Sequence, residues 1–135
     1  MGNFIKDNKI LLLQRHNTGY EDGKFSIVAG HVEHGESAKL ASIREIREEL
    51  GIIVNYNSLQ FIGVMHRKST EERVDFFLLA DDWIGEPSIS EPDKCSLLFW
   101  ADMNDLPSNT IPYIKFAIEN FKMYSSLPWI TEFGW

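Results

Sequence analysis

The sequence has one cysteine, no apolar run of membrane length and fewer basic than acidic residues. Because Cys95 has no second cysteine to pair with, an internal disulfide is excluded, which suits a reducing compartment and predicts a cytoplasmic protein. The lack of a long apolar segment and of a signal-peptide pattern predicts no membrane partner. The 13 basic and 20 acidic residues give a formal net charge of −7, so we expect no nucleic acid as a partner either.

The chain does have the composition of an ordinary globular domain. Of its 135 residues, 44% are hydrophobic and 24% are charged, which provides enough apolar material for one core. No internal repeat, linker or low-complexity stretch divides it. We therefore expect a single domain over residues 1–135, either as a monomer or as a homodimer.

Short β-type segments lie on both sides of one strongly helical stretch. Strands are predicted at residues 3–6, 10–14, 25–29, 59–67, 73–80 and 97–101. The run 10–13 is continuously apolar, which favours a strand covered on both faces. Pro112 at a first helical position opens a second helix, predicted to reach about residue 124. This order predicts an α/β fold with a mixed β-sheet between helices.

Three carboxylates gather on the helical stretch that follows Gly30. Glu45, Glu48 and Glu49 occupy relative positions 0, +3 and +4, which places them on one face of a helix. The opposite face carries the apolar residues Leu40, Ile43, Ile46 and Leu50. Acidic stripes on helices are commonly just solvated faces, but a hard divalent cation would turn their mutual repulsion into binding.

Residues 30–52 as a whole resemble the Nudix hydrolase signature, G-x5-E-x7-R-E-U-x-E-E-x-G-U, in which U is an aliphatic residue. Gly30, Glu36 and the run 44–52 match every fixed position. Ser37 is well placed to cap the helix, and Gly51 is a natural residue to end it. Segments similar to the usual Nudix framework also occur at residues 12–15, before residue 25, at 83–87 and at 99–107.

The resemblance implies a Nudix-type α/β/α sandwich that hydrolyses a nucleoside diphosphate linked to another group, X, with Mg²⁺ or Mn²⁺ as cofactor. By the same resemblance, the metal ligands are the carbonyl of Gly30 and the carboxylates of Glu45, Glu48, Glu49 and, in a later loop, Glu91. These helix glutamates are also the catalytic candidates, and Glu48 or Glu49 is expected to accept the proton of the attacking water.

Two further residues are expected to support this site. By resemblance, Glu36 matches the position that holds loop and helix together. Arg44 is close enough in the sequence to pair with Glu36 or with Glu48. Such a pair would fix the loop relative to the carboxylates of the helix.

Five residues outside the helix are candidates for substrate binding. Arg15 ends a predicted strand where a cation could reach phosphate, and His31 follows the glycine of the metal loop. Tyr20 could stack on a base, His66 ends a strand beside Arg67, and Tyr113 could close the pocket. For each of them, an ordinary surface or packing role is the competing interpretation.

Three functions stay open, and each involves a small-molecule nucleotide. Hydrolysis of a nucleoside triphosphate to the monophosphate and pyrophosphate is favoured by the compact chain. An ADP-ribose or nucleoside-diphosphate-sugar pyrophosphatase commonly has an extra N-terminal region, and little precedes the first predicted strand here. A non-catalytic nucleotide-sensing module is disfavoured by the intact set of carboxylates.

Overall fold

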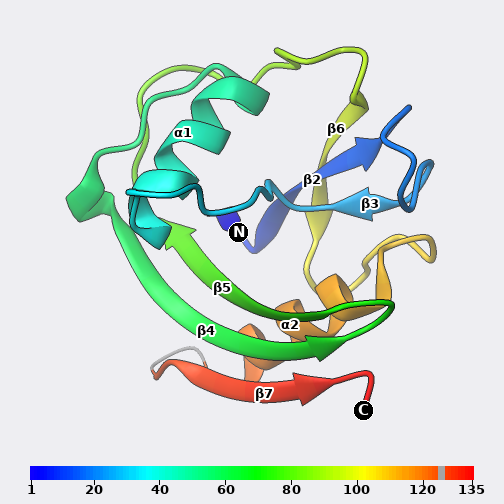
Figure 1. Cartoon of the computed structure of the whole chain (residues 1–135). Coiled ribbons are helices and arrows are strands. Elements are labelled where there is room, and N and C mark those ends of the chain that lie inside the picture. Colours follow the sequence, from blue (N-terminus) through cyan, green and yellow to red (C-terminus); the bar gives the residue numbers. More distant parts are fainter. Residues whose placement is uncertain (125–126) are drawn as a thin grey trace.

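The computed structural model describes residues 1–124 and 127–135, which form two α-helices and one seven-stranded sheet (Figure 1). The helices are α1 (Ala38–Leu50) and α2 (Pro112–Met123), with a 3-10 helix, η1, at Tyr56–Ser58. The strands are β1 (Gly2–Lys6), β2 (Lys9–Arg15), β3 (Phe25–Ser26), β4 (Leu59–Lys68), β5 (Glu72–Ala80), β6 (Cys95–Asp102) and β7 (Trp129–Phe133). Within the described ranges, neither helix combines the length and hydropathy that a membrane crossing requires.

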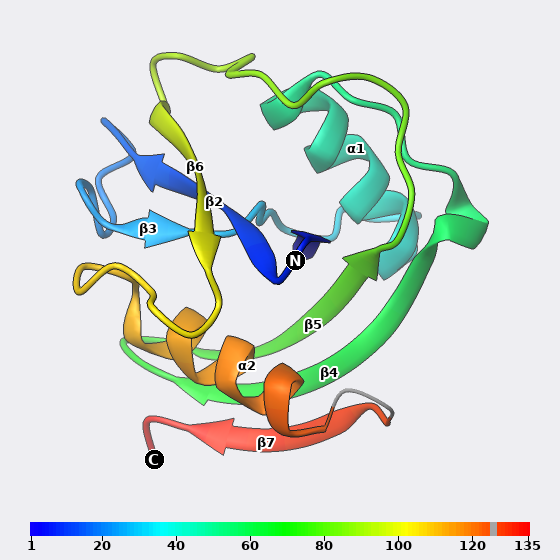
Figure 2. The same cartoon turned by 180° about the vertical axis from the view of Figure 1, so that it is seen from behind.

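The sheet is mixed. Its order is β3-β2-β1-β5-β4-β7, and β6 pairs with β2 outside this path. Strand β1 is antiparallel to β2 but parallel to β5, and β7 is parallel to β4. The two opposite views show α1 near the arrowhead of β5 and α2 alongside β4 and β7 (Figures 1 and 2).

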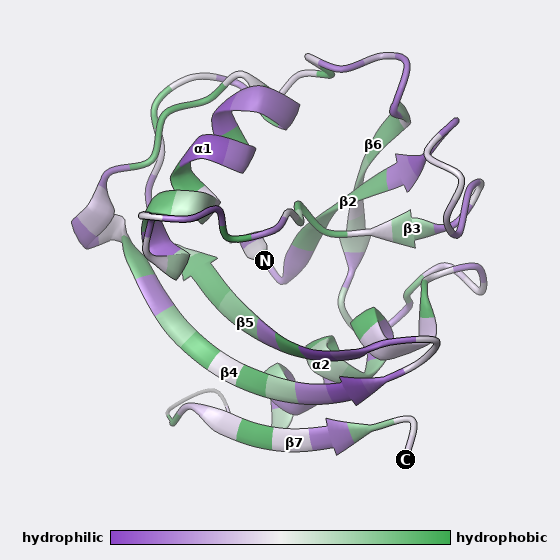
Figure 3. Cartoon of the chain, viewed as in Figure 1, coloured by the Kyte–Doolittle hydropathy of each residue, from purple (hydrophilic) through white to green (hydrophobic). Residues whose placement is uncertain are grey.

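Two hydrophobic cores lie between the sheet and its two helices. In β5, Phe77 packs in the core of α2 and the next residue, Leu78, packs in the core of α1. In β2, Leu12 likewise packs in the core of α2, and Leu11 packs in the core of α1. Because successive side chains of a strand point to opposite faces, α1 and α2 cover opposite faces of the sheet. The predicted α/β fold with a sheet between helices is confirmed, as is the apolar strand buried on both faces (Figure 3).

Three expectations about single elements are wrong. The strand predicted at residues 25–29 is only β3, because after Ser26 the chain makes a single bridge, from Val28 to Gly2, before it turns into the Gly30 loop. The prediction has no strand in the C-terminal tail, where β7 forms beside β4. Leu40, placed on the apolar face of its helix, is 49% exposed because it lies in the first turn, away from the buried residues Ile46 and Leu50.

Candidate active site

Capping residues fix both ends of α1. Ser37 is the N-cap, and its Oγ accepts a hydrogen bond from the N–H of Leu40 at 3.2 Å. Gly51 ends the helix in the left-handed conformation, with φ of 68°, and its N–H donates to the carbonyl of Arg47 at 3.0 Å. Both predicted caps are present, and they set the register in which the helix presents its carboxylates.

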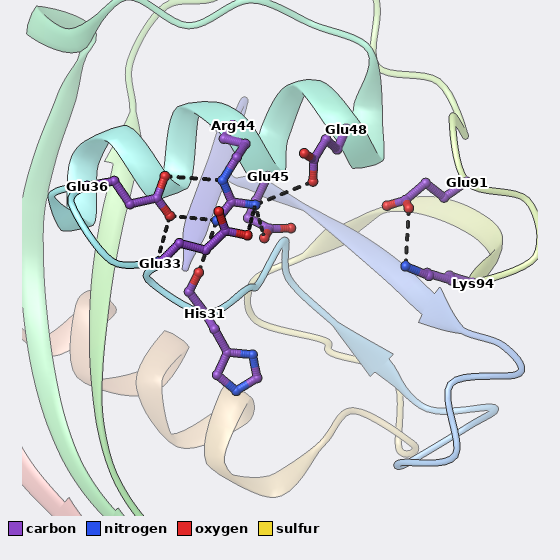
Figure 4. A network of polar contacts seen from close by, with 8 residues as sticks. All are labelled: His31, Glu33, Glu36, Arg44, Glu45, Glu48, Glu91 and Lys94. Atoms are coloured by element: carbon purple, nitrogen blue, oxygen red, sulfur yellow. Dashed lines mark hydrogen bonds and ion pairs between the residues drawn. The ribbon is translucent and has the colours of Figure 1, made fainter.

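Arg44 ties the loop after Gly30 to α1 (Figure 4). Its Nε and Nη2 donate to the two carboxylate oxygens of Glu36, at 3.2 and 2.7 Å. Nη2 also donates to the carbonyl of His31 at 3.0 Å, and Glu36 accepts from the N–H of Glu33 at 2.9 Å. Hydrogen bonding to Arg44 lowers the pKa of Glu36. The fork-shaped guanidinium therefore fixes the path of the loop through Glu36.

Glu45 lies directly against Gly30. A Cβ atom at position 30 would lie 2.1 Å from the carboxyl carbon of Glu45, so any side chain there would displace Glu45. The Oε1 of Glu45 accepts from Nη1 of Arg44 at 2.7 Å, and Glu48 lies 3.5 Å from the same nitrogen. Two members of the predicted ligand set, Gly30 and Glu45, thus meet where the loop crosses the helix.

One carboxylate oxygen of Glu49 is buried without a hydrogen bond. This oxygen, Oε2, is inaccessible to solvent and has no hydrogen-bond partner among residues 1–124 and 127–135. Burial, together with the charges of Glu45 and Glu91, raises the pKa of Glu49 to about 8, although a hydrogen bond from the backbone of Ala29 acts to lower it. The predicted ligands Glu45 and Glu91 are therefore each close enough to repel Glu49.

In the part of the chain that the structure describes, no three His, Cys, Asp or Glu side chains are grouped to hold a metal ion as they stand. Figure 4 shows the reason: Glu45 and Glu48 are linked to Arg44, and Glu91 pairs with Lys94 at 3.3 Å. The pairs of Glu48 and of Glu91 each include a side chain that is more than half exposed, so these pairs are weak and cost little to break. The unpartnered oxygen of Glu49 beside these acids fits a divalent cation, because such ions take carboxylate oxygens.

Arg15 and Tyr20 belong to one tightly bonded loop. The Nε of Arg15 donates to the carbonyl of Tyr20 at 2.7 Å, and its Nη2 donates to Oγ1 of Thr18 at 3.1 Å. The Tyr20 ring is 45% exposed, and the Arg15 guanidinium lies 5.4 Å from its centroid. The charge of Arg15 also lowers the pKa of Glu49. Arg15 therefore shapes this loop while it lies within electrostatic reach of the carboxylates.

His31 connects the Gly30 loop to β5. Its Nε2 lies 2.9 Å from Nη1 of Arg73, which also pairs with Glu71 at 2.8 Å. Because a guanidinium only donates, His31 accepts this hydrogen bond through Nε2. The ring points away from Arg44 (Figure 4), so the loop backbone and the His31 ring are anchored by two different arginines.

His66 and Arg67 lie on opposite faces of β4. The ring of His66 packs against that of Trp135 in a tilted arrangement, with 4.6 Å between centroids. Arg67 is buried, its Nε donates to Oδ2 of Asp75 at 2.7 Å, and its guanidinium carbon lies 3.9 Å from the ring centroid of Tyr113. Of the predicted substrate-binding residues, Tyr113 lies on the same face of the sheet as the Arg67 side chain. His66 points to the opposite face.

Sequence reasoning assigned no role to Arg73 or Asp75. The signal available was the period of two along β5, which puts residues 73, 75 and 77 on one face. With Phe77 in the core, Arg73 and Asp75 had to point to the same side of the sheet as α2. Only the long-range pairing of β4 with β5 shows which partners they meet.

Known proteins share this arrangement. The NUDIX domain family matches residues 2–127. The chain belongs to the Nudix family. The ADP-ribose pyrophosphatase of Methanocaldococcus jannaschii is 36% identical over 113 residues, which are 82% of this chain and 64% of that protein. The chain thus spans less than two thirds of the length of that relative.

Two other Nudix relatives match over most of their length. The 8-oxo-dGTP diphosphatase of Escherichia coli is 27% identical over 111 residues, 81% of this chain and 85% of that protein. The crystal structure of a MutT Nudix hydrolase from Burkholderia pseudomallei has a TM-score of 0.81 at 30% identity and covers 88% of this chain and 92% of its own. The family inferred from residues 30–52 is confirmed, and Nudix hydrolases generally use divalent metal cations.

Proposed function

We propose that this Nudix protein cleaves a nucleoside triphosphate to the monophosphate and pyrophosphate. The observation that carries the proposal is the carboxylate of Glu49, which has a buried, unpartnered oxygen beside Glu45 and Glu91. Burying such a group costs free energy unless a proton or a cation compensates it. A merely solvated acidic face would not bury an unpaired oxygen at its centre.

The groups that would hold Mg²⁺ or Mn²⁺ are the carbonyl of Gly30 and the carboxylates of Glu45, Glu48, Glu49 and Glu91. When bound, the cation neutralises phosphate charge and lowers the pKa of a bound water. Arg44 would release Glu45 and Glu48 while it keeps Glu36 and the His31 carbonyl, so the loop would hold its place.

Glu49 is the stronger of the two candidate proton acceptors. In the metal-free fold its carboxylate is buried and its pKa is raised to about 8, which favours uptake of a proton. Glu48 is exposed on the same helix and beside Arg44. Because close carboxylates titrate as a set, we assign the proton to the pair and rank Glu49 first.

Cationic and aromatic side chains around the carboxylates would bind the rest of the substrate. Arg15, the His31 ring and Arg73 would contact phosphate near the Gly30 loop. Tyr113, whose ring lies against Arg67, and Tyr20, whose side chain is half exposed beside Arg15, would contact the nucleoside. His66 lies under Trp135 and is left without a substrate role in this scheme.

The name of one relative favours a second candidate function. The Methanocaldococcus relative is an ADP-ribose pyrophosphatase, whereas the Escherichia relative is an 8-oxo-dGTP diphosphatase, whose substrate is a nucleoside triphosphate. We rank the triphosphate first because the 8-oxo-dGTP diphosphatase is matched over 85% of its length, whereas the ADP-ribose pyrophosphatase of Methanocaldococcus is matched over 64%. We further propose that the enzyme is cytoplasmic and is a monomer or homodimer. We expect no nucleic-acid or membrane partner.

A substrate panel tests these alternatives. Nucleoside triphosphates, ADP-ribose and nucleoside-diphosphate sugars are incubated with Mg²⁺, and phosphate and pyrophosphate are measured separately. We expect E49Q and E48Q to lower turnover by about a hundredfold or more. E119Q, at an exposed position of α2, is the matched control and should keep full activity. Near-normal turnover in both variants at saturating Mg²⁺ would refute the scheme, and nucleotide binding without any turnover would favour the sensor.

A further inference from the structure

A buried ion pair lies beside the first turn of α2. The side chains of Arg67 and Asp75 are only 6% and 10% exposed, and they join β4 to β5 through the 2.7 Å bond from Nε to Oδ2. Tyr113, in the first turn of α2, covers one face of the guanidinium at 3.9 Å. Side chains from β5 and α2 thus hold the planar guanidinium of Arg67, which comes from β4, in a fixed orientation.

Arg67 has hydrogen-bond donors that the protein does not use. Among residues 1–124 and 127–135, Nε has the acceptor Asp75, but neither η nitrogen has one. A guanidinium carries most of its N–H groups on its η nitrogens. The η nitrogens of Arg67 are not among the buried, unpartnered side-chain atoms of the described residues, so solvent reaches them. A ligand with acceptor atoms can therefore take the place of water on these donors.

The ion pair lies within reach of the proposed catalytic residues. Arg73 is the cross-strand partner of Arg67 in the β4–β5 register, and it contacts His31 in the Gly30 loop. A nucleotide whose phosphates lie at the Gly30 loop would therefore direct its base towards Arg67.

We propose that Arg67, oriented by Asp75 and Tyr113, selects nucleotides whose base presents two adjacent acceptors, namely guanine and cytosine, over adenine. This inference rests on the proposed hydrolysis of nucleotides and names their base. A guanidinium donates a fork of two hydrogen bonds, which matches O6 and N7 of guanine or O2 and N3 of cytosine. Adenine places an amino donor beside N7, so it cannot accept both bonds of the fork.

The test compares GTP, CTP and ATP in the wild type and in R67K. Lysine keeps the positive charge but lacks the planar fork. We expect the wild type to prefer GTP and CTP, and R67K to lower kcat/KM for both by about tenfold or more while it changes ATP little. K68Q, the adjacent residue on the opposite face of β4 near Trp135, is the control and should leave the base preference unchanged.

Two further measurements separate base selection from loss of fold. R67Q/D75L removes both charges of the pair, so no single charge is left buried, and its thermal unfolding shows whether the domain still folds. The double variant should lose the preference and keep cleavage of ATP. Equal loss for all three bases, or a wild type without preference, would overturn the inference. Binding of GMP, CMP and AMP by calorimetry reads the same preference if the wild type cleaves no nucleotide, so a failure of the proposed hydrolysis is distinguished.

Discussion

The backbone of Gly30 and the carboxylate of Glu45 occupy adjoining space with no room for a side chain between them. The φ angle of Gly30 lies outside the left-handed region, so glycine is required there for space and not for backbone freedom. Arg44 holds Glu45 from the other side at 2.7 Å. The placement of this carboxylate therefore depends on one residue of the loop and one of the helix.

G30A should weaken metal binding more than it weakens the fold. The added methyl group would push Glu45 out of its contact, while the caps of α1 and the Arg44–Glu36 pair stay in place. We expect the apparent affinity for Mg²⁺ to fall by about tenfold or more, since misplaced ligands are costly to metal sites. Calorimetric titration with Mg²⁺ measures the affinity, and thermal unfolding in chelator measures the fold. An unchanged Mg²⁺ affinity would remove Glu45 from the ligand set.

R44K should destabilise the protein even without metal. Lysine cannot bond both oxygens of Glu36 and the His31 carbonyl together, so part of this network is lost. We expect the free energy of unfolding to fall by about 2 kcal/mol, the usual cost of removing charged hydrogen bonds from a half-buried site. Urea unfolding in chelator measures the change. R47K, at an exposed position of the same helix, is the control, and an equal effect of both variants would contradict the prediction.

The effect of Mg²⁺ on stability should depend on pH through Glu49. Its pKa is about 8 in the metal-free fold and near 4.5 in the unfolded chain, so the unfolded chain ionises first. The contribution of Glu49 to metal-free stability is therefore full below about pH 4.5 and is lost as the pH rises through about 8. A divalent cation needs the ionised form, so its binding releases a proton and strengthens as the pH rises to about 8.

Thermal unfolding with and without Mg²⁺, between about pH 6 and about pH 8, measures this linkage. We expect the stabilisation by Mg²⁺ to grow with pH in the wild type. In E49Q the growth should be much smaller, because the glutamine side chain of that variant has no proton to release. A stabilisation that stays constant with pH in the wild type would show that Glu49 is already ionised before the metal binds.

The sequence alone predicted the parts of the site that depend on local spacing. The caps Ser37 and Gly51, the pairing of Arg44 with Glu36 and the face of the helix all follow from positions within 20 or so residues of one another. The environment of Arg67 could not be predicted in this way, because its partners come from β5 and α2 through long-range pairing. For the same reason the sequence favours His66 over Arg67 as a substrate-binding residue, although the two residues face opposite sides of the sheet.

The C-terminal strand was missed for a similar reason. Residues 129–133 alternate only briefly between apolar and polar, and their partner in β4 lies far away in the sequence. The pairing depends on a glycine in that partner: Gly63 lies opposite Trp129, whose indole ring covers it. Such a contact between one glycine and one aromatic ring leaves no periodic pattern in the sequence.

G63A should therefore destabilise β7 selectively. A Cβ atom at position 63 would lie 2.1 Å from a ring carbon of Trp129, and the buried indole packs against Phe77, 5.2 Å away between centroids. The ring cannot move without disturbing the α2 core, so we expect a loss of about 1–3 kcal/mol, as for other overpacked sites. I130A, at a side chain 86% exposed on the same strand, is the control and should change stability by less than about 0.5 kcal/mol.

Hydrogen exchange of the β7 amides should accelerate in G63A and not in I130A, because the parallel pairing with β4 loosens first. Equal protection of β7 in G63A and wild type would show that the strand is held without the Trp129 contact.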